Sequence, residues 1–170
     1  MTPPATRAEP IRYTGCGLDD IWLADGYVIE WFDGEPTIAI HDLDGLLRAI
    51  ARAVTTVARP LAGKEIRFLR RQMDLTQAEL ATLLGCDVQQ VARYEKDQNR
   101  IPGPADRLLR LLWSDHAGEL VALRPLLATL SAMRSAVPGR LVLTLGPDGW
   151  YARPDPNCVP RDQPALAVSG

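Results

Sequence analysis

The sequence has few residues of the kinds that ligate metals or form disulfides. Its 170 residues include three cysteines, Cys16, Cys86 and Cys158, and two histidines, His41 and His116. An odd number of widely spaced cysteines does not build a disulfide framework. A structural zinc site needs four ligands, usually supplied as close pairs, and the sequence has no CxxC or HxxxH pair. We therefore expect no metal site and no cofactor.

Long apolar runs are also missing. No run approaches the roughly 20 apolar residues that a membrane-spanning helix needs. The proline-containing start of the sequence lacks the hydrophobic segment of a secretory signal. We expect a cytoplasmic protein that does not contact a membrane.

Motifs for catalysis are absent too. The sequence has no GxSxG nucleophile motif and no Walker phosphate loop. Its carboxylate pairs, Asp19 with Asp20 and Asp42 with Asp44, each have a local role available as a turn or a helix cap. These observations favour a binding protein over an enzyme.

Charge is distributed unevenly along a chain whose composition, 46% hydrophobic and 24% charged, is typical of a folded protein. Residues 1–60 carry five basic and nine acidic side chains, whereas residues 61–113 carry nine basic and seven acidic ones. Only the middle segment favours an anionic partner, and its excess of basic over acidic side chains is small. Charge alone therefore does not identify a nucleic-acid-binding protein.

Three short segments near the start have the composition of strands. Residues 21–23, 27–32 and 37–40 are rich in β-branched and aromatic side chains. Asp25-Gly26 and Asp33-Gly34 separate them, and Asp-Gly is typical of tight hairpin turns. We predict a small antiparallel meander.

Helical periodicity follows the predicted meander. Asp42 is a good N-cap, and apolar residues at helical spacing predict a helix over residues 43–54. A second apolar stripe predicts a helix over residues 119–133. Residues 141–145 and 150–151, separated by a Gly-Pro-Asp-Gly turn, predict a hairpin.

Two capping signals flank a glycine in the middle of the sequence. Thr76 and Glu79 form the S/T-x-x-E pattern of a capping box, which predicts a helix over residues 77–84. Gly85 suits the left-handed backbone conformation that ends a helix.

The capping pattern recurs after this glycine. Asp87 and Gln90 predict a second capping box and a second helix over residues 88–96. Two helices joined by a turn of about three residues form a helix-turn-helix. Small or apolar residues occupy the inward positions of this unit: Leu80, Ala81, Leu84, Cys86, Val91 and Tyr94. The second helix therefore buries one side and presents long polar side chains that suit a DNA major groove.

Residues 63–112 resemble the phage-repressor type of helix-turn-helix domain, often called the XRE family. The resemblance is carried by Phe68-Leu69-Arg70-Arg71, Leu75-Thr76-Gln77-Ala78-Glu79-Leu80-Ala81, Gly85, Val91 and Tyr94-Glu95-Lys96. It implies binding to double-stranded DNA. It also implies a salt bridge between Arg70 and Glu95, because repressors of this type pair the residues at these two positions.

A wider resemblance, over residues 13–113, is to bacterial regulators of the MqsA antitoxin type. It is carried by Tyr13-Thr14-x-Cys16-Gly17-Leu18-Asp19, Trp22-Leu23, Gly26-Tyr27, His41-Asp42 and Ile101-Pro102-Gly103-Pro104-Ala105-Asp106-Arg107-Leu108-Leu109-Arg110. Better-known members bind a toxin through an N-terminal zinc module built from paired cysteines, and this sequence lacks those pairs. The resemblance implies a toxin protein as a second kind of partner.

The position of each residue in the helix-turn-helix predicts its role on DNA. The residues predicted to read base edges are Val88, Gln89, Gln90 and Arg93. Those predicted to contact phosphate are Thr76, Gln77, Lys96, Asn99 and Arg100.

These patterns predict an α+β fold. A central five-helix, repressor-like helix-turn-helix domain is flanked by a small N-terminal antiparallel sheet plus helix and by a C-terminal β-hairpin. The predicted segments are a flexible arm at 1–10, a sheet and helix at 11–60, the helix-turn-helix domain at 61–113, a helix and hairpin at 114–152 and a flexible tail at 153–170.

The predicted function is that of a homodimeric, sequence-specific repressor, controlling its own operon from an inverted-repeat operator. The alternative is a protein-interaction adaptor, such as an antitoxin, that uses the fold mainly for protein contacts. Two candidate dimer surfaces are the strands around Tyr27, Ile29 and Trp31 and the helix that carries Leu120, Leu123 and Leu127.

Overall fold

The computed structural model of the chain describes residues 10–119 and 140–153. Helices and strands both contribute to this part of the chain, so the predicted α+β class is confirmed. Apart from one end residue each, the predicted helix at 119–133, the predicted arm at 1–10 and the predicted tail at 153–170 lie outside the described residues.

Five helices lie within the described ranges: α1 (Leu43–Thr56), α2 (Gly63–Gln72), α3 (Gln77–Leu84), α4 (Val88–Glu95) and α5 (Gly103–His116). The sequence predicts five helices for the central helix-turn-helix domain. Helices α2–α5 belong to that domain, and α1 lies before its predicted start at residue 61, so the count of five includes α1. The Asp42 side chain caps α1 as predicted, because it accepts a hydrogen bond of 3.0 Å from the N–H of Gly45.

A four-stranded sheet joins the two ends of the described chain. Its strands are β1 (Ile11–Arg12), β2 (Ile21–Leu23), β5 (Leu141–Gly146) and β6 (Gly149–Arg153), in the order β1-β2-β5-β6. Strands β5 and β6 form the predicted C-terminal hairpin. Strand β5 also runs parallel to β2, so Ile21 pairs with Leu141.

Strands β3 (Tyr27–Phe32) and β4 (Glu35–Ile40) form a separate two-stranded sheet, which we call the ribbon. Its turn is the predicted Asp33-Gly34. Both residues have positive φ, 49° and 81°, as expected for a two-residue hairpin turn that follows the twist of its strands.

The predicted single meander over residues 21–40 is wrong, because β2 belongs to the other sheet. After β2 the chain continues along β5, where the N–H of Ala24 donates to the carbonyl of Leu143 at 2.9 Å. The Asp25 carboxylate then accepts from the N–H of Leu145 at 2.6 Å. Gly26, with φ 74°, turns the chain away beside the ring of Trp150. The Asp25-Gly26 pair is therefore a corner between sheets, not a hairpin turn.

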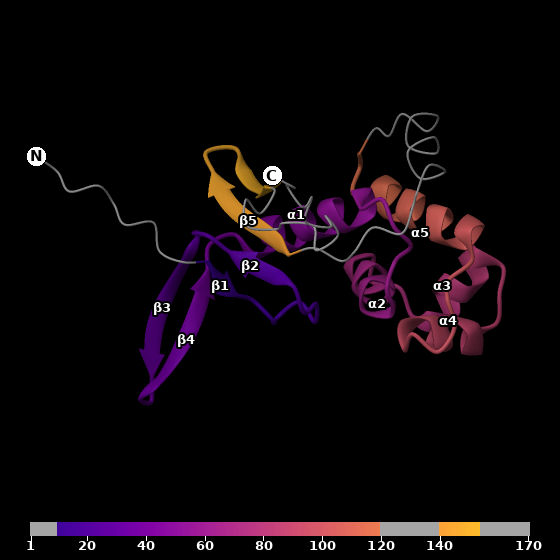
Figure 1. Cartoon of the computed structure of the whole chain (residues 1–170), viewed down its shortest axis with the longest axis horizontal. Helices are drawn as coiled ribbons and strands as arrows, with labels where there is room; N and C mark the ends of the chain where they lie inside the picture. Colours follow the sequence, from indigo (N-terminus) through magenta and orange to yellow (C-terminus); the bar gives the residue numbers. More distant parts are fainter. Residues whose placement is uncertain (1–9, 120–139, 154–170) are drawn as a thin grey trace, which may run out of the picture.

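One hydrophobic core links the four-stranded sheet to the helices. Helix α1 packs against β6 on one side and α2 on the other. Its buried Ile50 belongs to the same cluster as Leu143 of the sheet and Leu69 of α2. Helices α2–α5 gather at one end of the molecule, and the ribbon extends at the other end (Figure 1).

Candidate nucleic-acid interface

The first capping box of the predicted helix-turn-helix is present at the start of α3. The Thr76 hydroxyl accepts from the N–H of Glu79 at 3.2 Å, and the Glu79 carboxylate accepts from the Thr76 N–H at 2.7 Å. Hydrogen bonds from the Thr76 N–H and hydroxyl hold the pKa of the Glu79 carboxyl below its ordinary value. The sequence therefore predicted the beginning of α3 correctly.

The turn between α3 and α4 follows the predicted glycine geometry. Gly85 has φ 67°, and the N–H of Cys86 donates to the carbonyl of Ala81 at 3.0 Å. Leu80, Ala81 and Val91 are buried where the two helices meet. The small side chain of Ala81 permits the close approach of α4, as the sequence predicted.

The second predicted capping box, between Asp87 and Gln90, is wrong. The Asp87 side chain makes no capping hydrogen bond. The side-chain oxygen of Gln90 accepts instead from the amide of Asn99 at 3.2 Å. The loop after α4 folds back onto the helix, where the N–H of Gln98 donates to the carbonyl of Arg93 at 2.9 Å. Because this places Asn99 beside Gln90, the Gln90 side chain bonds to the loop and not to the start of α4.

Helix α4 has one exposed side and one buried side. Val91, Tyr94 and Glu95 are buried. The residues predicted to read bases lie on the other side, where Val88, Gln89 and Arg93 are exposed and Gln90 is half-buried. Lys96, Asn99 and Arg100, which were predicted to contact phosphate, are all exposed. The structure therefore leaves the predicted base-reading residues Val88, Gln89 and Arg93 of α4, and the predicted phosphate-contacting residues of the loop after it, accessible to a partner.

The two remaining predicted phosphate contacts, Thr76 and Gln77, use their side chains within the protein. The Thr76 hydroxyl donates to Glu79 at 2.7 Å. The Gln77 amide donates to the Glu95 carboxylate at 2.8 Å. Their side chains are thus positioned by neighbours, and the groups at this helix end that have no helical partner are the backbone N–H groups of Gln77 and Ala78.

Glu95 is the centre of a buried polar cluster under the predicted interface. Its side chain is 1% exposed and accepts from Arg70 at 2.5 and 3.2 Å and from Arg67 at 3.4 Å, as well as from Gln77. Burial raises the pKa of the Glu95 carboxyl, but the hydrogen bonds from Arg70 and Gln77 outweigh burial and hold that pKa below its ordinary value. The structure thus brings together Arg70 and Glu95, the pair that the family resemblance implied.

A second contact to the end of α4 has no counterpart in the sequence analysis. Gly63, the first residue of α2, donates its N–H to the Asp97 carboxylate at 2.6 Å. A Cβ on Gly63 would lie 2.6 Å from the carbonyl oxygen of Tyr94 and 2.7 Å from that of Glu95. Only a glycine lets α2 approach α4 this closely. Asp97 has φ 54° and lies far from Gly63 in the sequence, so no local pattern revealed the contact.

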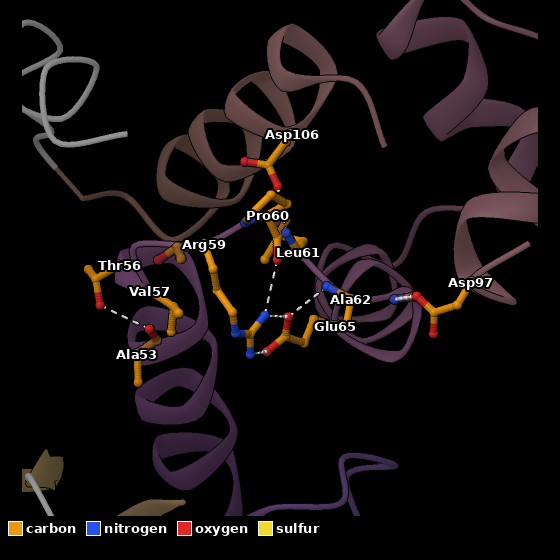
Figure 2. Close-up of polar contacts among 12 residues, drawn as sticks. Ala53, Thr56, Val57, Arg59, Pro60, Leu61, Ala62, Glu65, Asp97 and Asp106 are labelled. Atoms are coloured by element: carbon orange, nitrogen blue, oxygen red, sulfur yellow. Dashed lines mark hydrogen bonds and ion pairs between the residues drawn. The ribbon is translucent and has the colours of Figure 1, made fainter. Parts of the chain in front are cut away.

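The linker between α1 and α2 is fixed by two ion pairs that sequence reasoning also missed. Figure 2 shows the Arg59 guanidinium and the Glu65 carboxylate pointing toward each other, with both of their nitrogen–oxygen distances at 2.7 Å. The hydrogen bond with Glu65 raises the pKa of Arg59 above its ordinary value. Glu65 also accepts from the N–H of Ala62 at 2.8 Å.

The second pair joins Asp106 and Arg110 inside the protein. Arg110 is fully buried, and its Nε donates to Asp106 at 2.9 Å. Its other nitrogens donate to the carbonyls of Thr55, Val57 and Arg59. The i,i+4 spacing of Asp106 and Arg110 was the signal available in the sequence. It indicates a pair on one helix face but not the backbone carbonyls that surround it.

Two other kinds of feature are absent from the part of the chain that the structure describes. Within residues 10–119 and 140–153, no cluster of His, Cys, Asp and Glu could hold a metal ion. No helix in those ranges is long and apolar enough to cross a membrane.

One family model matches the segment of the chain that contains the candidate interface. Residues 66–106, which contain all of α3 and α4, match the family model described as Helix-turn-helix. No curated protein and no solved structure matches the chain. The matched segment is an XRE-like helix-turn-helix, and the chain that carries it is a DNA-binding regulator. This match does not test the wider resemblance to regulators of the MqsA antitoxin type, so that resemblance stays a prediction.

Proposed function

We propose that this DNA-binding regulator is a sequence-specific transcriptional repressor that binds its operator as a homodimer in the cytoplasm. The observation that carries the proposal is the two-sided character of α4. Its buried residues are fixed to α2 and α3, whereas its exposed residues include both long polar side chains and one apolar side chain. A helix of this kind can enter a major groove and contact base edges.

Two exposed residues of α4 and the residue that directly follows it have the spacing of one helix face. Gln89, Arg93 and Lys96 are separated by four and three residues, which places them on the same side of a helix. Arg93 has the fork of donors that binds guanine, and Gln89 has the donor and acceptor that bind adenine. Val88 is 44% exposed and can touch a thymine methyl group.

Phosphate contacts would fix the helix in the groove. Lys96, Asn99 and Arg100 lie directly after the base-reading face and reach the backbone on one side. On the other side, the first two N–H groups of α3 would bind a phosphate, because a helix N-terminus attracts an anion. The Thr76 and Gln77 side chains would then support this contact rather than make it.

A homodimer follows from the small size of the reading surface. An eight-residue helix is about 12 Å long, so it contacts only a few base pairs. Proteins with this motif gain affinity by pairing two half-sites that are separated by whole turns of the duplex, about 34–36 Å each. An inverted-repeat operator in the chain's own promoter would make it an autorepressor.

An antitoxin-like adaptor that holds a toxin is the second function that the sequence predicted. It requires an apolar surface outside the helix-turn-helix, and the exposed ribbon is the observation that favours it. It is compatible with DNA binding, since α4 and the ribbon are at opposite ends of the molecule (Figure 1).

Selection from a random pool of duplex DNA, followed by fluorescence anisotropy at two salt concentrations, tests the repressor function. We expect an enriched inverted repeat and a loss of sequence preference in the double variant Gln89→Ala/Arg93→Ala. The matched control is Arg48→Ala, which removes one exposed positive charge from α1. If no sequence is enriched and the double variant binds every duplex as the wild type does, the proposal is wrong.

A further inference from the structure

The two faces of the ribbon differ in polarity. Directly opposite residues of paired strands share a face, and Ile29 pairs with Ile38 while Trp31 pairs with Pro36. We call these four residues the apolar face of the ribbon. Ile29 is 52% exposed, Ile38 41% and Trp31 72%. By the strand register the opposite face holds Glu30, Glu35 and Thr37, which are exposed, together with the apolar Val28 and Ala39 and the position of Phe32, so only this face carries charged residues.

Nothing in the described parts of the chain covers the apolar face. Strands β3 and β4 pair only with each other, and the neighbouring Tyr27 and Ile40 at the base of the ribbon are the members of its sheet that pack against the core. An isolated two-stranded sheet is at best marginally stable in water. A tryptophan and two isoleucines on one side of such a sheet are typical of a surface that another molecule covers.

We propose that a second copy of this chain covers the apolar face, by packing its own apolar face against it about a two-fold axis. The proposal rests on the repressor function above and gives its dimer a location. The apolar face has no charged side chain, so an identical face meets it without repulsion or a buried charge. The ribbon's carboxylates, Glu30 and Glu35, lie on the opposite face and stay in water. A basic partner would bind there and leave the apolar face bare.

The size of the apolar face sets the strength of this dimer. Its four partly exposed side chains supply on the order of 400 Å² per copy, about half of the roughly 800 Å² that each partner contributes to a standard interface. Such an area belongs to the weak, reversible class. We therefore expect dissociation at micromolar concentration and a tighter dimer when a full operator holds two copies.

Packing through the ribbon also leaves the DNA-reading side of α4 free. The ribbon extends from the end of the molecule that is opposite to α2–α5 (Figure 1). Each copy therefore keeps an unobstructed half-site reader, and its affinity for a single half-site is independent of the dimer.

Sedimentation equilibrium of the full chain, from about 1 to about 200 µM, tests the location of the dimer. The double variant Ile29→Thr/Trp31→Thr removes apolar side chains but keeps good strand formers. We expect its dissociation constant to rise about tenfold or more. The matched control is Val28→Thr, which removes an exposed apolar side chain from the opposite face of the same strand and leaves the dimer unchanged.

A second measurement does not depend on weakening the ribbon. Trp31→Phe keeps an apolar side chain, so the difference in acrylamide quenching between wild type and this variant reports the exposure of Trp31. We expect Trp31 to become protected as the protein concentration rises through the dimer range.

The outcomes separate the dimer surface from the repressor function. A wild-type chain that stays monomeric with and without operator DNA, or a dimer that the double variant leaves intact, overturns the proposed surface. A monomeric chain would favour a different protein on the ribbon. If the dimer forms as expected but single half-sites are not bound, the repressor function fails and the dimer surface stands.

Discussion

The side chains of Arg70 and Glu95 form a two-pronged ion pair, with nitrogen–oxygen distances of 2.5 and 3.2 Å, that joins α2 to the last residue of α4. Arg70 also donates to the carbonyl of Leu75 at 2.7 Å, so the same guanidinium fixes the chain before α3. One side chain thus sets the positions of both helices of the motif. The exposed residue Arg93 lies only two positions before Glu95, so its direction depends on this anchor.

Replacing Arg70 by alanine should destabilise the fold strongly. Glu95 is buried, and removing its main partner leaves a carboxylate in the interior, which costs about 3–5 kcal/mol. The measurement is the free energy of unfolding from urea titration. Arg71→Ala is the control, because Arg71 is exposed and should change stability by less than about 0.5 kcal/mol. Equal stability of the two variants would show that the pair contributes nothing.

The free energy of unfolding should fall as the pH is lowered, and protonation of Glu95 should account for part of that fall. The pKa of its carboxyl is lower in the folded chain than in the unfolded chain, so the unfolded state takes up the proton first as pH falls. The stabilisation is complete above about pH 4.3, the ordinary value for glutamate, and is lost as pH falls through the folded pKa.

Urea midpoints between neutral pH and pH 3 check this dependence. We expect Glu95→Gln to be less stable at neutral pH and to lose less stability in acid than the wild type. Glu30→Gln, on the exposed ribbon, should keep the wild-type slope. If Glu95→Gln lost as much stability between neutral pH and pH 3 as the wild type does, the acid dependence could not be attributed to Glu95.

The helix-turn-helix could be predicted from the sequence because its signals are local. The capping box lies within the four residues from Thr76 to Glu79, and a glycine such as Gly85 between two predicted helices is typical of a helix end. The hairpin turn at Asp33-Gly34 was equally local. The failed capping box at Asp87 shows the limit of this reasoning, since Asn99 from a later loop competes for Gln90.

Contacts between distant segments could not be predicted from the sequence. The parallel pairing of β2 with β5 joins residues that are far apart in the sequence, and no periodicity reports it. The same holds for the bond between Gly63 and Asp97 and for the three carbonyls around Arg110. Each depends on how α1, α2 and α5 pack, which is determined by the whole core.

Gly63→Ala should disturb the end of α4. The added methyl group would lie 2.6 Å from the backbone oxygen of Tyr94, so α2 and α4 must move apart, at a cost of about 1–3 kcal/mol. Half-site DNA affinity should fall along with thermal stability.

Gly103→Ala is the matched control for this change. Gly103 is also the first residue of a helix, but its added methyl group meets nothing closer than 3.7 Å. It should be neutral or stabilising by up to about 1 kcal/mol. If both alanine variants melt at the same temperature, the contact between Gly63 and α4 is not as tight as the structure has it.

Arg110→Met should be among the most destabilising single substitutions in the chain. The methionine fills much of the same volume but removes the donor to the carbonyls of Thr55 and Val57. It leaves the buried Asp106 carboxylate with the N–H of Leu61 and without its charged partner. We expect a loss of about 3–5 kcal/mol in the free energy of unfolding. Arg110→Lys should not restore it, because an ammonium group cannot span the same set of acceptors.

The control for Arg110 is its neighbour on the same helix. Arg107 is half-buried, and Arg107→Ala should cost far less than Arg110→Met in the same denaturant titration. A stable Arg110→Met variant would mean that the linker after α1 is fixed by Arg59 and Glu65 alone.

Two exposed cations at the end of α4 should have different effects on DNA binding. Arg93 lies on the base-reading side, so Arg93→Ala should cost roughly 1–3 kcal/mol on the selected operator and relax the preference at one base pair. Lys96 follows the helix and is proposed to meet phosphate. Lys96→Ala should therefore weaken binding to all sequences alike and reduce the slope of log affinity against log salt by about one unit.

Anisotropy titrations of both variants, on the operator and on operators changed at single base pairs, distinguish the two roles. The comparison is internal, because each variant removes one positive charge from an exposed side chain of the same segment. A simple charge effect would change both variants equally on every duplex. An Arg93→Ala protein that keeps both the affinity and the base preference of the wild type would show that Arg93 faces solvent and that the reading surface lies elsewhere on α4.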